Sequence, residues 1–189
     1  SVGRQSHPFA DNIGGKTSIF NVYGGSSDWN YASRSSNSMK FSTTQSGLTL
    51  DTIGIVDGSS TNTNAFDEFE VTISTKLFGS DVSVGYADDV NSDISYWGVA
   101  GSTDLGPLNM SSSYTIYDAA TDKYGLEVTA SYSIFSVGYG DKEGTGLSYT
   151  AGASHSLTDS VSVYAEGEMK DLDSGSDTTS WSIGSKITF

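Results

Sequence analysis

Cysteine is absent from this sequence, which excludes disulfide bonds and thiolate metal sites. Basic residues are scarce. Nine Lys or Arg stand against 23 Asp or Glu, and the formal net charge is −14. Because binding of nucleic-acid phosphates needs a basic face, this balance argues against nucleic acid as a partner. The excess of negative charge instead favours association with cations.

Long apolar runs are also missing. No window approaches 18 consecutive apolar residues, so the sequence predicts no transmembrane helix. Only 35% of the residues are hydrophobic, yet 12% are aromatic, and a disordered chain would lack aromatic and β-branched residues. The composition therefore indicates a folded chain with a thin apolar layer.

Alternation of apolar and polar residues is the dominant pattern from about residue 66 onward. The stretch "DEFEVTISTKL" places Phe69, Val71 and Ile73 on one face, with Glu68 and Glu70 on the other. The same period recurs up to the C-terminal "SWSIGSKITF", and no segment shows a helical period. We predict an all-β fold of about twelve strands, joined by loops of about two to eight residues as an antiparallel meander.

The polar face separates two all-β architectures. A soluble β-sandwich is the default for such a pattern. However, one face of the predicted strands is rich in residues that normally contact water: Ser111, Ser113, Thr129, Ser131, Ser148, Thr150, Ser162, Glu166 and Glu168. In a transmembrane antiparallel up-and-down β-barrel the apolar face contacts lipid and the polar face lines a wet lumen, so no packed core is needed. The low hydrophobicity favours the barrel.

Acidic residues are sorted between alternate loops. If the strands alternate in direction, every second connection lies at the same end of the sheet. One set contains Asp57, Asp67, Asp88, Asp89, Asp93, Asp118, Asp122, Asp141, Glu143, Asp171, Asp173 and Asp177, and the other contains Asp81, Asp104 and Asp159. The two ends of an outer-membrane barrel differ in this way. We predict that the acidic connections share one rim, opposite Phe189, with "DDVNSD" and "SLTDS" at different ends.

The N-terminal stretches "VGRQSHPFADNIGG", "GGSSDWNYASR" and "RSSNSMKFSTTQSGLTL" resemble the general porins of Gram-negative bacteria. In that family a strand with a Gly-Arg pair precedes a long loop that folds inward and narrows the pore. The matching positions here are Arg4, the loop 6–32, Arg34, Asn37, Ser38, Phe41, Gly47 and Leu48. Phe189 resembles the terminal aromatic residue that porins present to the assembly machinery. The resemblance implies one porin domain over residues 1–189, with residues 6–32 as the constriction loop.

One feature departs from the family. The inward loop of a porin follows the fifth of sixteen strands, whereas here it follows the first recognisable strand. Four strands, or about 60 to 90 residues, would precede it. The chain is therefore either the C-terminal portion of a sixteen-stranded barrel or a twelve-stranded barrel of its own. We expect the portion, because "SVGRQ" leaves too few alternating residues to cross a membrane.

The resemblance also implies a constriction with fixed charges. Arg4 and Arg34 would form its basic side, facing Asp11 or Asp28 of the loop, and Lys40 is a further candidate on the polar face. The family often has a glutamate beside a Gly-Gly pair near the loop tip. Here Val22 and Tyr23 precede that pair, so the acid has moved or is missing. The alternative is that both arginines, the only two in the chain, are ordinary surface cations.

Other candidate sites are weak. His7 and His155 lack the partners of a catalytic triad. Pairs such as Glu68 and Glu70 could suit glycoside hydrolysis, but lining of a lumen is the simpler use. We predict no enzyme activity, no cofactor and no metal site, with loose calcium binding by the acidic loops as the one exception.

The resemblance implies a porin of the bacterial outer membrane. Such a protein would form a water-filled channel for passive diffusion of small hydrophilic solutes and ions, and the charge predicts a preference for cations. It implies a homotrimer in contact with membrane lipid and lipopolysaccharide. The alternative function is a secreted or surface β-sandwich that binds carbohydrate. The transported solute, the conductance and the organism do not follow from the sequence.

Overall fold

The computed structural model describes residues 1–25, 33–56, 66–89, 93–118 and 122–188. The first strands along the chain are β1 (Val2–Ser6), β2 (Arg34–Gln45), β3 (Leu48–Ile55), β4 (Glu68–Leu77), β5 (Ser80–Asp89) and β6 (Ile94–Leu105). The remaining strands are β7 (Leu108–Asp118), β8 (Lys123–Tyr132), β9 (Phe135–Lys142), β10 (Gly146–Thr158), β11 (Val161–Leu172) and β12 (Thr178–Ile187).

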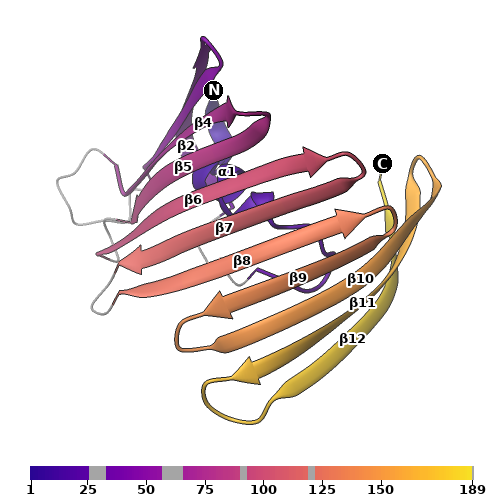
Figure 1. The fold of residues 1–189 in the computed structure, drawn as a ribbon. Helices are drawn as coiled ribbons and strands as arrows, with labels where there is room; N and C mark the ends of the chain where they lie inside the picture. The colour runs from indigo at the N-terminus through magenta and orange to yellow at the C-terminus, as the bar shows by residue number, and fades with distance from the viewer. Residues whose placement is uncertain (26–32, 57–65, 90–92, 119–121, 189) are drawn as a thin grey trace.

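All twelve strands belong to one antiparallel sheet whose spatial order is the chain order, from β1 to β12. Figure 1 shows this sheet as a single curved layer, with the segment that follows β1 on its concave side. The prediction of an up-and-down sheet of about twelve strands is confirmed. A sandwich would have required two facing sheets.

The two rims of the sheet differ, as predicted. Two-residue turns link β2 to β3, β4 to β5, β6 to β7, β8 to β9 and β10 to β11, and they follow the upper and right-hand edge of the sheet in Figure 1. The longer connections lie at the opposite rim, and the described residues of the acidic set lie in these connections or in the strand ends beside them. The "DDVNSD" connection joins β5 to β6 and the "SLTDS" connection joins β10 to β11, so they lie at different ends. Phe189 and Asp57 lie outside the described residues.

The short turns use backbone conformations that fix the pairing of the strands. Ser46 and Gly47 between β2 and β3, and Phe78 and Gly79 between β4 and β5, all have positive φ. Positive φ at both central residues is what a type I′ turn needs, and that turn matches the twist of the strands it joins. The two strands are in register up to the turn, where Gln45 pairs with Leu48.

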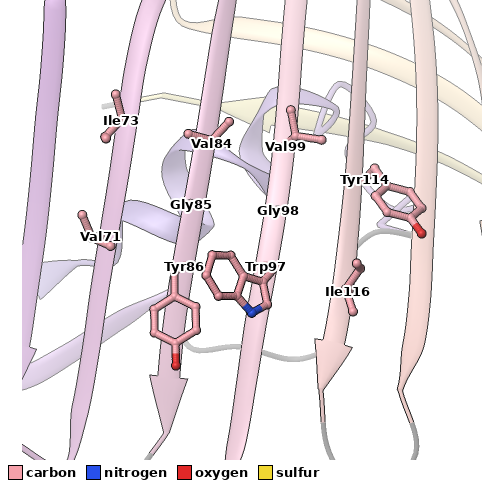
Figure 2. Close-up of a pocket in the computed structure, with 10 residues that line it drawn as sticks. All are labelled: Val71, Ile73, Val84, Gly85, Tyr86, Trp97, Gly98, Val99, Tyr114 and Ile116. Atoms are coloured by element: carbon pink, nitrogen blue, oxygen red, sulfur yellow. The ribbon is translucent and has the colours of Figure 1, made fainter.

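Apolar side chains cover the convex face. On this face Trp181 is 76% exposed and Ile183 is 73% exposed, and Phe69, Tyr114 and Tyr132 are also exposed. Figure 2 shows Val71, Tyr86 and Tyr114 on the face opposite the inner segment. Aromatic residues pair across this face, as where the ring centroids of Tyr86 and Trp97 lie 4.5 Å apart. The outward apolar face is therefore confirmed.

Two short helices interrupt the pattern, although the sequence predicted no helical segment. They are α1 (Pro8–Asn12) and the 3₁₀ helix η1 (Gly14–Lys16). A helix of five residues is too short to show an amphipathic period, and Pro8 at its start was the one available signal. Neither helix of the described chain has the length and apolar character that a membrane span requires.

Candidate functional site

The candidate site is the inner segment, which we define as residues 7–25, together with the wall of the sheet that it contacts. The segment leaves β1 where the backbone N–H of His7 donates to the carbonyl of Ser33 at 3.0 Å. It then contacts β4, β8 and β11 in turn through the hydrogen bonds described below. Three inward-facing glutamates on those strands hold it.

Glu70 on β4 holds the start of α1. Its Oε2 accepts the backbone N–H of Phe9 at 2.9 Å, and its Oε1 lies 2.5 Å from Nδ1 of His7. Glu70 is 3% exposed and His7 is fully buried. An ionised carboxylate only accepts hydrogen bonds, so Nδ1 of His7 carries the proton of this contact.

Glu127 on β8 holds both the middle and the end of the inner segment. Its Oε2 accepts the hydroxyl of Thr17 at 2.9 Å, and its Oε1 accepts the backbone N–H of Gly25 at 2.8 Å. The neighbouring Gly24 has a φ of +95°, and a Cβ there would lie 2.9 Å from Oε1 of Glu127. A glycine therefore allows the backbone to approach this carboxylate closely.

Glu166 on β11 receives three hydrogen bonds from two residues. Its Oε1 accepts the backbone N–H of Asn21 at 2.7 Å and the side-chain amide of Asn21 at 2.8 Å. Its Oε2 accepts the backbone N–H of Val22 at 3.0 Å. Both oxygens of the carboxylate are thus used by the segment.

These contacts satisfy two sets of buried polar groups at once. A buried carboxylate is costly unless hydrogen bonds replace its water, and a chain segment without regular structure needs partners for its backbone N–H groups. Hydrogen bonds to charged groups contribute about 1.5–3 kcal/mol each to stability. The three glutamates therefore fix the inner segment on the wall rather than leave it as a free loop.

Small wall residues receive the apolar side chains of the segment. Phe9 and Ile13 are fully buried and pack against Ala87 and Ala100. They also cover the paired glycines Gly85 and Gly98. A Cβ at Gly98 would lie 2.6 Å from Ile13, and one at Gly85 would lie 3.1 Å from Phe9.

A second apolar contact lies further along the segment. A Cβ at Gly138 on β9 would lie 2.8 Å from the ring of Phe20, and one at Gly152 on β10 would lie 3.4 Å from it. The wall thus lacks side chains where the segment supplies aromatic rings. This match places the segment at one position along the wall.

The segment changes the environment of the polar face. The alternating sequence predicted that this face lines a water-filled lumen, but Ser113 and Thr129 are each 1% exposed and Glu166 is 6% exposed. Glu70 and Glu166 serve as partners of the segment rather than as lumen lining. The sequence showed that these glutamates face inward, but their partners lie 61 to 145 residues away along the chain.

The predicted charged residues occupy three kinds of position. Lys40 of β2 and Asp11 of α1 come together, with their Nζ and Oδ2 atoms 3.8 Å apart. Nζ of Lys40 also donates to the carbonyl of Ser6 at 3.2 Å. Arg4 lies in β1 and Arg34 begins β2, and both are exposed. Asp28 lies outside the described residues, so the constriction role of this set stays a prediction.

The outer face carries a shallow apolar depression of about 430 Å³ over β4 to β7. Figure 2 shows the side chains around it: Val71, Ile73, Val84, Tyr86, Trp97, Val99, Tyr114 and Ile116. It lies on the opposite side of the sheet from Phe9 and Ile13. Among the described residues, no three His, Asp or Glu side chains gather as metal ligands. Calcium binding by the acidic loops stays a prediction.

No protein-family profile and no curated protein sequence matches the chain. Solved structures do match its fold. A loop L8 deletion mutant of OmpT, an outer membrane protein of Vibrio cholerae, aligns over 98% of this chain and 74% of its own, with a TM-score of 0.76 and 16% identity. OmpF of Salmonella typhi, solved in complex with daunomycin, aligns over 98% of this chain and 73% of its own, with a TM-score of 0.76 and 14% identity.

A third structure, described as a porin, aligns over 90% of this chain and 66% of its own, with a TM-score of 0.56 and 19% identity. The chain therefore has the porin-like fold of outer-membrane β-barrel proteins, as its N-terminal and C-terminal motifs implied. At these identities the likeness establishes the fold alone.

Proposed function

We propose that this chain is part of an outer-membrane porin, a water-filled channel through which small hydrophilic solutes and ions diffuse passively. The observation that carries the proposal is the inner segment, held by Glu70, Glu127 and Glu166 on the concave face of a sheet whose convex face is apolar. A segment in that place narrows the space on the concave side of the sheet. We propose no catalytic role for any residue.

The same arrangement supports an outer-membrane location. Apolar and aromatic side chains on the convex face suit contact with lipid and with lipopolysaccharide. We propose a homotrimer on the resemblance to the general porins. The β-sandwich that binds carbohydrate is not favoured, because the strands of the described residues form one sheet.

We further propose a preference for cations. Acidic residues at one rim and a net charge of −14 would raise the local concentration of cations at the channel mouth. This attraction should weaken as salt screens it, because the Debye length falls to about 3 Å at 1 M salt.

Planar-bilayer recording of the refolded full chain tests the proposed function. We expect stepwise conductance, a reversal potential of the cation-selective sign in a salt gradient, and a weaker preference at high salt. Protein that stays soluble without detergent and produces no conductance steps would contradict the proposal. A heat-modifiable band on a denaturing gel would establish a folded barrel independently of conductance.

A further inference from the structure

His7 is the one ionisable side chain of the described chain that is fully buried, and it lies where the inner segment leaves the sheet. One ring nitrogen, Nδ1, contacts Glu70 on β4 at 2.5 Å. The other, Nε2, lies 2.8 Å from the hydroxyl of Ser35 on β2. The imidazole of His7 therefore connects the first residue of the inner segment to two strands of the wall, β2 and β4.

We propose that the His7–Glu70 contact is a pH-sensitive latch that holds the start of the inner segment, with α1, against the wall. When the ring is protonated, both nitrogens donate: Nδ1–H to Glu70 and Nε2–H to Ser35. When it is neutral, Nε2 becomes an acceptor, Ser35 must turn its hydroxyl, and Glu70 keeps its charge without a cation beside it. The latch is therefore tighter in the protonated state.

The surroundings of His7 set the direction of this switch. Burial lowers the pKa of His7, but the hydrogen bond and negative charge of Glu70 raise it, with further contributions from Glu68 and Asp11, and the net pKa is raised above 6.5. The charged groups on the elements around it are Glu68, Glu70 and Lys76 on β4, Asp11 on α1, Lys40 and Arg34 on β2, and Arg4 on β1. The stabilisation is thus fully present below about pH 6.5 and is lost as the pH rises through the raised pKa.

Release of the latch would move charged side chains within the proposed channel. The same glutamate binds the backbone of Phe9, and α1 carries Asp11, the partner of Lys40. A looser α1 would move this ion pair relative to the wall. This consequence rests on the proposed channel function, whereas the latch itself does not.

The latch can be tested without a channel assay. Hydrogen exchange at residues 9–13 is measured in the refolded full chain from about pH 6 to pH 9, corrected for the intrinsic effect of pH on exchange. His155, exposed on β10, is the only other histidine, so H155Q is the matched control and leaves His7 as the single imidazole among these 189 residues. We expect protection to fall as the pH rises, by up to about tenfold for each unit by which the pKa is raised, in the wild type and in H155Q.

In H7Q the amide can still donate to Glu70 but does not titrate, so the corrected protection should be independent of pH. An unchanged pH dependence in H7Q would overturn the latch. If H7Q does not fold, the pKa of His7 is measured in H155Q from the NMR resonance of its imidazole. A pKa above 6.5 supports the latch, and a pKa at or below 6.5 overturns it. Pore conductance is recorded in parallel. If hydrogen-exchange protection depends on pH but no conductance steps appear, only the channel proposal is rejected. If conductance steps appear but protection does not depend on pH, only the latch is rejected.

Discussion

Asn21 donates two hydrogen bonds to a single oxygen of Glu166, one from its backbone N–H at 2.7 Å and one from its side-chain amide at 2.8 Å. The two residues are 145 positions apart, and Glu166 is 6% exposed. This contact holds the inner segment on β11, far along the sheet from the latch at β4. It allows a direct test of whether this attachment affects the proposed channel.

We expect E166Q to loosen residues 20–22 without unfolding the sheet. One oxygen becomes a donor that faces the donors of the segment, at a cost of about 1–3 kcal/mol to the local attachment. The measurements are hydrogen exchange of residues 20–22 and noise in single-channel current, and both should increase. The control is E168Q, the same change two residues along the same face, where the side chain pairs with Lys170 at 3.0 Å. Equal effects of the two variants would contradict a specific anchor at Glu166.

Gly98 tests the packing of α1 against the wall. A Cβ in G98A would lie 2.6 Å from Ile13 and 2.9 Å from Phe9, so the segment must shift, at a cost of about 1–3 kcal/mol. We expect the temperature at which the folded gel band disappears to fall. On the same strand, G101A meets no atom closer than 3.4 Å and should be tolerated. The double variant G98A/I13A should recover part of the loss, and failure to do so would place the strain elsewhere.

Lys40 and Asp11 test the charge of the proposed constriction. K40Q removes a positive charge and should increase cation preference, whereas D11N removes a negative charge and should decrease it. Reversal potentials in a salt gradient measure both effects, which should shrink at high salt. Since the pair is separated by 3.8 Å, each variant serves as the control for the other. Shifts in the same direction would show that selectivity is not set by their charges.

Arg34 tests the prediction, implied by the resemblance to the general porins, that this arginine lies at the constriction. R34Q should increase cation preference, because it removes one of the nine Lys or Arg side chains of the chain. K186Q, on the exposed inward position at the far end of β12, is the control for a general loss of positive charge. An unchanged reversal potential in folded R34Q would place this arginine away from the constriction.

Val99 tests the proposed lipid contact of the convex face. A lysine in V99K would lie beside Trp97 and Tyr114 on the outer face, and a cation at the midplane of a bilayer costs about 2–4 kcal/mol. We expect folding into lipid vesicles to be impaired, as measured by the yield of the heat-modifiable band. S180K, at an exposed inward position on β12, should fold normally. Equal folding of both variants would contradict a lipid-facing outer surface.

Strand alternation, which is a property of the sequence, determines much of the architecture of this protein. A period of two places Val71 and Ile73 on one face and Glu70 on the other, whatever the strands pair with. Short links between such strands require antiparallel neighbours, so the sorting of acidic connections to one rim also followed. The same local rules could not detect α1, because five residues do not establish a helical period.

Tertiary structure alone decided what the inward residues do. The alternation shows that Glu70, Glu127 and Glu166 leave the same face, but curvature of the sheet brings all three to one chain segment. His7 is an isolated histidine in the sequence, and it acquires a carboxylate partner 63 residues away only because β4 lies beneath the start of the segment. Local periodicity depends on backbone geometry and could therefore be predicted from the sequence. Long-range burial depends on the path of the whole chain and could not be predicted in this way.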